Sequence, residues 1–445
     1  MFGCLVGSEM CIRDRDIPIA DIQELTKMNG RLTSLMMTTL MIASALAGCA
    51  GNDVDVDLDD EDGGYTYASN VDNHRMLMGD VCDIKDLSGA YDWDEVSDIY
   101  ENGKYAEKSD GSFRTLQGFA DASGKNHAYD DYYGADGSWN DFVSAAISGT
   151  GAFAGESNTV RDQAVEKGIQ NGVMTAYAIH ELNAAIIKAE AGNWGPDDAQ
   201  HAWDEGWAFY HGPDDSGHDY DGCGPFATAA KRGGNFGTGD ATNDATLAAM
   251  NAGLAALKAE DMQGVVDARD EVLKNVVIVY SQASVRYASK MTVDLDEANG
   301  DYDKHQAEGH AFFRVIEAYI ADHTDSCYNN KTHGMAYIGA SEASTCDAFT
   351  WTTYQGSDVC YNTAVHIVYA PEGVNETICE GFASVFPGSG MPGYYADYGA
   401  SKIVEIFDLK NDGDTDADYE AHVRMYLQPV WDAFGITADD IGTLQ

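Results

Sequence analysis

The sequence has little positive charge. Its 445 residues include 26 lysines and arginines against 74 aspartates and glutamates, which gives a formal net charge of −48. Nucleic-acid binding depends on basic side chains that neutralise phosphates, so this balance argues against a nucleic-acid partner. An acidic surface concentrates cations instead, although it also keeps a protein soluble in salty media. The negative charge is therefore compatible with a metal ion as the partner, but it does not indicate which metal binds.

Proline and strand-like alternation are also scarce. Only 8 prolines interrupt the chain, and no stretch alternates convincingly between apolar and polar residues. Apolar residues recur instead every three or four positions, as on one face of a helix. The longest such pattern of the first half covers Thr159–Ala191, and the second half has helical patterns over Asp240–Glu260 and Asp261–Val293. These patterns predict a mainly α protein.

Catalytic and cofactor signatures are missing. The sequence contains no G-x-S-x-G motif, P-loop or dinucleotide-binding fingerprint. His180 and Glu181 begin like the H-E-x-x-H helix of zinc peptidases, but Ala184 stands where the second histidine must be. We therefore expect a protein that is not an enzyme.

Long hydrophobic runs are limited to one near the N-terminus. Residues Met1–Arg15 resemble a translated sequencing adapter, so we expect residues 1–27 to be an artefact and Met28 to be the true start. The apolar run Leu32–Leu46 is too short for a stable membrane span. Residues 28–48 instead have the pattern of a signal peptide, which predicts export.

The end of this signal peptide predicts a lipid anchor. Leu46-Ala47-Gly48-Cys49 matches a bacterial lipobox, in which Cys49 is lipidated after cleavage. The alternative is an ordinary A-x-A cleavage site at Ala45–Ala47. Residues 49–64 are strongly acidic, and like charges keep such a segment extended, as suits a tether. We expect an outer-membrane or cell-surface lipoprotein, otherwise a periplasmic or secreted protein, that meets a membrane only through this anchor.

Six cysteines remain after Cys4, Cys11 and Cys49 are assigned to the adapter and the lipobox. An even number in an exported chain predicts disulfides, with many pairings open. No CxxC pair occurs, which argues against a structural zinc site. The last four lie in a turn-rich stretch, residues 325–400, which we expect to be a disulfide-stapled insertion. The predicted disulfide cysteines are Cys82, Cys223, Cys327, Cys346, Cys360 and Cys379.

Two parts of the chain repeat each other at an offset of 103 positions. At this offset Asp198–Gly212 overlaps its echo Tyr302–Tyr319 over residues 302–315, and Val173–Tyr177 aligns with Val276–Tyr280. One offset shared by two separate segments indicates a tandem duplication. We therefore expect two related helical bundles, over residues 65–235 and 236–445.

Each copy carries a histidine and a carboxylate at helical spacing. His201 precedes Glu205 by four residues, and His305 precedes Glu308 by three, so each pair shares a helix face. Histidines and carboxylates from facing helices form metal sites in the cores of helical bundles, and a phenolate suits a hard cation such as ferric iron. The candidate metal ligands are Tyr177, His180, Glu181, His201, Glu205, Tyr280, His305, Glu308 and His310.

A purely structural interpretation competes with this one. Taken singly, each candidate could be a hydrogen-bonded core residue beside aromatic neighbours such as Trp203 and Phe312. Few lysines or arginines lie near Glu205 in the sequence, however, and an unpaired buried carboxylate is costly. Lys304 could pair with Glu308 because it lies four residues earlier. We predict that both glutamates face inward and bind Fe³⁺ or another metal cation.

Three stretches together resemble the low-iron-inducible periplasmic protein family, the algal iron-assimilating proteins related to phytotransferrins. They are Asp92–Ala120, Ala178–Trp194, and the pair formed by Asp204–Gly212 and Ala307–Ile320. The resemblance covers residues 65–445. It implies extracytoplasmic iron binding or uptake, with an iron transporter or reductase in the envelope as a partner.

A more distant resemblance is to imelysin-type iron-regulated lipoproteins. Their G-x-H-x-x-E motif is half met by His305 and Glu308, with Asp303 in place of the glycine. From the sequence we therefore expect an extracytoplasmic iron-binding protein of high-affinity iron acquisition. The alternative is an acidic structural or adhesive lipoprotein of the cell envelope that binds divalent cations loosely.

Overall fold

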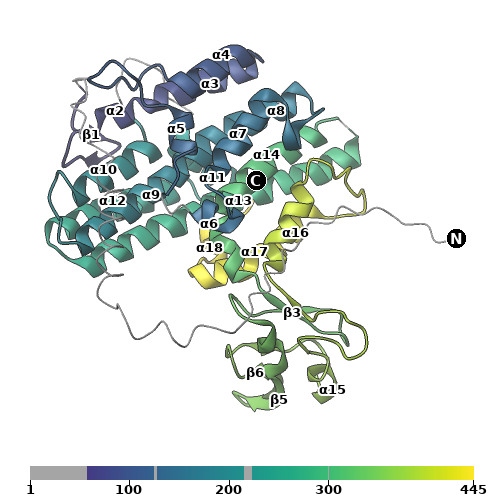
Figure 1. The fold of residues 1–445 in the computed structure, drawn as a ribbon. Coiled ribbons are helices and arrows are strands. Elements are labelled where there is room, and N and C mark those ends of the chain that lie inside the picture. The colour runs from purple at the N-terminus through teal and green to yellow at the C-terminus, as the bar shows by residue number, and fades with distance from the viewer. Residues whose placement is uncertain (1–57, 125–127, 215–222, 299) are drawn as a thin grey trace, which may run out of the picture. The chain divides into compact units, whose positions relative to one another are not determined.

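The computed structural model describes residues 58–124, 128–214, 223–298 and 300–445 (Figure 1). Helices dominate these ranges, which confirms the mainly α prediction. The predicted signal peptide, the lipobox cysteine Cys49 and most of the tether lie outside the described residues. Within the described ranges, no helix combines the length and the apolar character that crossing a membrane requires.

The helices fall into two successive groups. Those before residue 240 are α2 (Asp72–Arg75), α3 (Leu77–Gly89), α4 (Trp93–Asn102), α5 (Leu116–Ala120), α6 (Ala128–Tyr133), α7 (Ser138–Ser148), α8 (Asn158–Lys167), α9 (Met174–Glu190), α10 (Ala199–Tyr210) and α11 (Gly224–Phe236). Those after it are α12 (Ala241–Lys258), α13 (Met262–Glu297), α14 (Tyr302–Ile320), α15 (Glu376–Cys379), α16 (Tyr398–Phe407), α17 (Tyr419–Phe434) and α18 (Ala438–Ile441). Short 3₁₀ turns cover Gly151–Phe153, Ala321–His323 and Ala343–Ala348.

A π-helical turn, Gly168–Val173, joins α8 to α9, so the helix predicted over Thr159–Ala191 is nearly continuous. Such turns insert one extra residue per turn and widen the helix locally. Gly172 lies against the ring of Trp139, where a Cβ atom would come within 2.3 Å of the indole. The glycine therefore permits α7 to pack closely on this turn.

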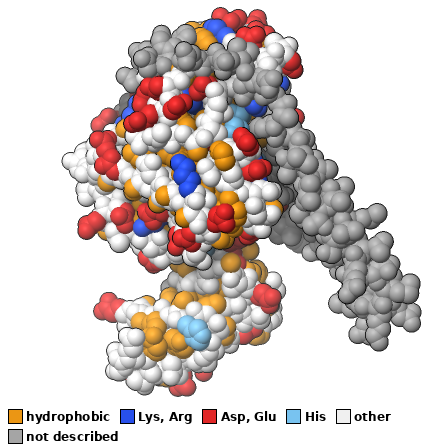
Figure 2. Space-filling model, turned by 90° about the vertical axis from the view of Figure 1, so that its left-hand side faces the viewer, with side chains coloured by type: hydrophobic (Ala, Val, Ile, Leu, Met, Phe, Trp, Pro, Cys, Tyr) orange, Lys and Arg blue, Asp and Glu red, His pale blue; other side chains and the backbone are white. Residues whose placement is uncertain are grey.

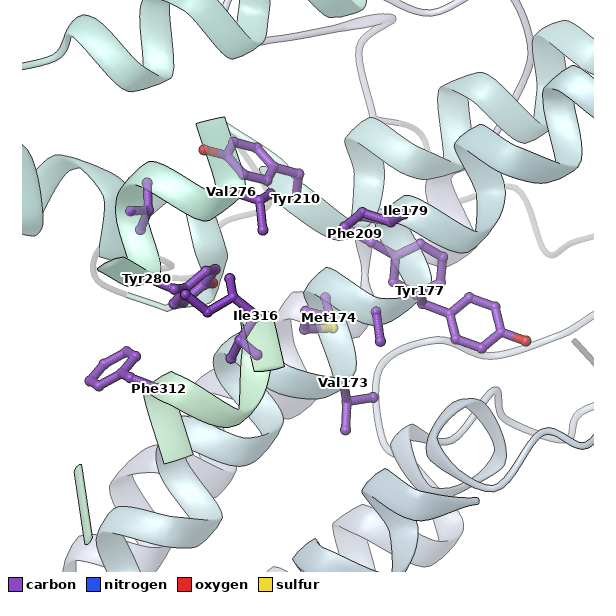
Figure 3. Close-up of a cluster of buried hydrophobic side chains, with 14 of the residues drawn as sticks. Val173, Met174, Tyr177, Ile179, Phe209, Tyr210, Val276, Tyr280, Phe312 and Ile316 are labelled. Carbon is purple, nitrogen blue, oxygen red and sulfur yellow. The ribbon is translucent and has the colours of Figure 1, made fainter. Parts of the chain in front are cut away.

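Three pairs of helices dominate the packing: α9 lies against α10, and α13 lies against both α12 and α14. Gly206 allows the first pair to approach, because a Cβ there would come within 2.7 Å of Leu182 on α9. The segments matched by the sequence repeat thus lie on α9 and α10 in the first copy and on α13 and α14 in the second. All four helices contribute to one hydrophobic core, in which Val173 and Phe209 lie in the same cluster as Val276 and Phe312 (Figure 3).

The region after α14 is built differently. Six short antiparallel strands form two three-stranded sheets, ordered β4-β3-β8 and β5-β6-β7. Their bounds are β3 (Ser326–Tyr328), β4 (Met335–Tyr337), β5 (Phe349–Tyr354), β6 (Ser357–Asn362), β7 (Val368–Tyr369) and β8 (Tyr394–Tyr395). A further hairpin near the N-terminus pairs β1 (Glu61–Asp62) with β2 (Tyr65–Thr66). These strands are too short to show the alternating pattern by which a sequence reveals strands.

The six predicted disulfide cysteines form three bonds, as predicted. Cys327 pairs with Cys346, and Cys360 pairs with Cys379, which staples the sheet region. A separate small core packs around these bonds and includes Phe349 and Phe382. The third disulfide joins Cys82 of α3 to Cys223, the residue before α11.

Acidic side chains are scattered over the face of the molecule seen in Figure 2, with few lysines and arginines between them. One acid, Asp80 of α3, is buried instead. Its Oδ1 accepts the Tyr105 amide at 3.1 Å, while its Oδ2 has no hydrogen-bond partner. Burial raises the pKa of Asp80 to about 7.

Asp80→Asn is therefore expected to stabilise the protein at high pH. The unfolded chain releases this proton near pH 4 and the folded chain near pH 7, so the native state binds more protons in this window and loses stability as pH rises. The asparagine variant should gain roughly 2 kcal/mol at about pH 8 and little at about pH 4. Urea unfolding at both pH values measures this, and an equal change at both would contradict the assignment.

Candidate metal-binding site

Glu205 lies at the centre of a buried cluster of histidines and carboxylates. Its Oε1 is 3.1 Å from Nε2 of His201, one turn earlier on α10, and 3.2 Å from Nε2 of His74 on α2. It also forms a side-chain hydrogen bond with Glu181 of α9. We call these four residues the Glu205 cluster. Three helices thus contribute to it, of which α2 lies far from α9 and α10 in the sequence.

The hydrogen bonds around His201 fix its tautomer. Asp204 accepts hydrogen bonds from Tyr65 Oη at 2.6 Å and from the Ala68 and Ser69 amides, so it acts as an acceptor. The single hydroxyl proton of Ser69 is donated to Asp204 at 2.7 Å. Because Ser69 Oγ also lies 2.9 Å from Nδ1 of His201, that nitrogen must be the donor. Nε2 of His201 faces the Glu205 carboxylate at 3.1 Å, and its hydrogen bond there favours the ionised carboxylate.

His74 presents a neutral imidazole. Burial lowers its pKa to about 3, although the nearby Glu205 carboxylate acts in the opposite direction. Its Nδ1 is buried and has no hydrogen-bond partner. A neutral imidazole is the form that binds metals.

The charge of Glu205 is favoured by its neighbours. Burial alone would raise the pKa of this carboxyl. His74, His201 and Glu181 outweigh that effect and hold the pKa well below its usual range. The carboxylate is therefore ionised in a site from which water is almost excluded, since its side chain is only 4% exposed. A hydrogen bond between Glu205 and Glu181 requires a shared proton, because two carboxylates offer acceptors only.

The separations in the cluster match those between ligands of one metal ion. Two atoms that each lie about 2.1 Å from a metal are themselves about 3.0 to 3.4 Å apart in octahedral or tetrahedral geometry. The two Nε2–Oε1 distances, 3.1 and 3.2 Å, fall in this range. Across the described ranges, however, no group of three or more His, Cys, Asp or Glu side chains is already arranged as a metal site. A metal would thus have to displace the shared proton and reorient the Glu205 carboxylate.

Two other predicted ligands lie at the edge of this cluster. Nε2 of His180 is 3.8 Å from Oε1 of Glu181. The ring of Tyr177 contacts that of His180, with centroids 5.1 Å apart, and also packs on Phe119 at 4.5 Å. The structure therefore brings together all five candidates of the first copy, with Glu205 and His201 innermost.

The second copy forms a separate cluster on α13 and α14. Glu308 is buried, as is Glu205, so the prediction that both face inward is confirmed. Oε1 of Glu308 accepts the Tyr287 hydroxyl at 3.0 Å, and its Oε2 lies 3.9 Å from Nε2 of His305. Lys290 of α13 reaches the same nitrogen at 2.9 Å. Lys290 is thus a basic neighbour of this cluster, and the guanidinium of Arg232 lies 5.6 Å from the centre of the Tyr287 ring.

Tyr280 and His310 make other contacts. The hydroxyl of Tyr280 lies 3.0 Å from Thr175 Oγ1 and 3.1 Å from Asn171 Oδ1. Figure 3 shows it on the opposite side of the core cluster from Tyr177. Nδ1 of His310 donates to the Phe407 carbonyl at 3.0 Å. The structure therefore does not bring all nine candidates to one point.

His74 is the ligand candidate that sequence reasoning missed. It lies in α2, which has only four residues, and more than one hundred positions separate it from His201. No spacing rule connects such residues. The buried pair formed by Arg75 with Asp62, at 2.6 Å, anchors α2 to the β1–β2 hairpin and thereby places His74 beside Glu205.

Comparison with known proteins gives one match. The sequence profile of a family described as "Low iron-inducible periplasmic protein" matches residues 38–320, which is more than half of the chain. The matched range contains every residue of both clusters and ends before the disulfide-stapled sheets. No curated protein and no solved structure matches the chain.

Proposed function

Because the chain belongs to the low iron-inducible periplasmic protein family, we propose that it is an exported iron-binding protein of iron acquisition. Ferric iron is the cargo, held by His74, His201 and Glu205, with Glu181 as a further carboxylate ligand. The protein stores or passes on this ion and carries out no catalysis. A transporter or reductase of the envelope takes the iron from it, and lipidation of Cys49 keeps it at the membrane.

One observation supports this proposal most strongly: two imidazole nitrogens lie 3.1 and 3.2 Å from one carboxylate oxygen of the buried Glu205, which is also hydrogen-bonded to Glu181. His201 is oriented through Ser69 by the carboxylate of Asp204. Metal-binding histidines are usually held in this way, with the second ring nitrogen donating to an acceptor.

The donor set also suits iron. Two imidazoles and one carboxylate form the facial arrangement found in non-haem iron proteins. A second carboxylate adds a hard oxygen donor and a second negative charge, which favours the ferric state. Tyr177 and His180 lie next to Glu181 and complete the surroundings of the site.

Titration of the purified chain with ferric nitrilotriacetate tests the proposal. One equivalent of iron should remain bound through gel filtration, because we assign one ion to the Glu205 cluster. Many weakly held equivalents that salt removes would instead favour the acidic envelope protein. Failure to retain iron would overturn the proposal.

A further inference from the structure

The second cluster, formed by Tyr287, Lys290, His305 and Glu308, contains metal-donor groups together with the ammonium of Lys290. The carboxylate of Glu308 lies 3.0 Å from the hydroxyl of Tyr287 and 3.9 Å from Nε2 of His305. Histidine, carboxylate and phenol together form a set suited to ferric iron. Lys290 Nζ lies 2.9 Å from the histidine nitrogen of this set.

The lysine settles how His305 is protonated. An ammonium group only donates, so Nε2 of His305 accepts from Lys290, and Nδ1–H donates to Asp294 Oδ2 at 2.5 Å. Nε2 of His305 thus presents its lone pair to the Lys290 ammonium. The two clusters differ in what faces Nε2 of the histidine: the Glu205 carboxylate in the first and the Lys290 ammonium in the second.

We propose that Lys290 supplies a built-in cation at a second, latent metal site, and that a metal ion binds to His305, Glu308 and Tyr287 when this ammonium is absent. In the native chain the lysine balances the charge of Glu308 and keeps the site closed. The chain therefore holds one iron, although both copies keep the glutamate. This inference depends on the proposed function only in its use of iron as a probe.

The surroundings of the cluster support a metal in place of the lysine. Lys290 and His305 line a cavity of about 360 Å³ that also borders Arg286 and Asp301, which gives an ion a path from solvent. The guanidinium of Arg232 lies 5.6 Å from the centre of the Tyr287 ring. Its positive charge would stabilise a phenolate at Tyr287.

The variant Lys290→Met tests the inference, because methionine keeps the length of the side chain and removes its charge. Titrated with ferric nitrilotriacetate, K290M should bind one more equivalent of iron than the native chain. This additional equivalent should bind at least about ten-fold more tightly than any second equivalent that the native chain takes up. The added iron should show a visible phenolate-to-iron absorption band. The band should disappear in K290M with Tyr287→Phe.

Two controls keep the outcome clear. Lys258→Met removes an exposed lysine of α12 and should leave the stoichiometry unchanged. K290M combined with Glu205→Gln should still bind iron at the second site, so that failure of the first site does not hide the second. A folded K290M chain, shown by an unchanged circular dichroism spectrum, that binds no additional iron would overturn the inference. Extra iron that persists without Tyr287 and His305 would overturn it as well.

Discussion

Replacing Glu205 by glutamine is expected to weaken ferric binding by at least about ten-fold and to destabilise the metal-free chain near neutral pH. Glutamine keeps the shape of the side chain and removes its charge. In the metal-free chain His74, His201 and Glu181 favour this charge and hold the pKa of Glu205 well below its usual range, so its loss removes that stabilisation. With iron bound, the variant lacks the anionic oxygen that lies between His74 and His201.

Competition against nitrilotriacetate measures the affinity, and thermal unfolding without metal measures the stability. Glu190→Gln provides a matched control, since it removes an exposed charge from α9, the helix packed on α10. It should change neither quantity. If Glu205→Gln destabilised the metal-free chain and left ferric affinity intact, the cluster would be a structural ion network and the iron site would lie elsewhere.

Replacing Arg75 by methionine is expected to cost about 3 to 5 kcal/mol of stability. The guanidinium is 1% exposed and binds both oxygens of the fully buried Asp62, at 2.6 and 2.7 Å. It also donates to Asp72 at 2.7 Å. Removing it leaves the Asp62 carboxylate buried without a counter-charge, which is far worse than removing both partners together.

Urea unfolding measures this loss, with Arg424→Met as the control. Arg424 pairs with Glu420 one turn earlier, but both side chains are 30% exposed. Such surface pairs contribute at most about 1 kcal/mol. Equal losses in the two variants would contradict the view that the buried Arg75–Asp62 pair anchors α2. A large loss confined to Arg75→Met would support it.

Much of the fold followed from helical periodicity, because long amphipathic helices repeat their apolar residues over many turns. The α9–α10 pair and α13 were predicted in this way. The same periodicity placed His201 and Glu205 on one face, and their contact at 3.1 Å follows directly. Local spacing is sufficient to predict a side-chain contact where both residues belong to one helix.

Contacts between distant helices could not be predicted from spacing. His74 reaches Glu205 from a helix of four residues, and Lys290 reaches His305 from the preceding helix rather than from its own. The spacing favoured Lys304 as the partner of Glu308, because both residues lie on α14. The lysine that contacts His305 comes from α13 instead. The short strands between Ser326 and Tyr395 were missed because two to six residues show no clear alternation.

X-ray absorption at the iron edge of the iron-loaded chain tests the central claim most directly. Rigid imidazole rings bound to iron give characteristic outer-shell scattering. The native chain should show two imidazoles among nitrogen and oxygen ligands, and His74→Leu should show one. A spectrum of oxygen ligands alone, unchanged by His74→Leu, would contradict the assignment of iron to the Glu205 cluster.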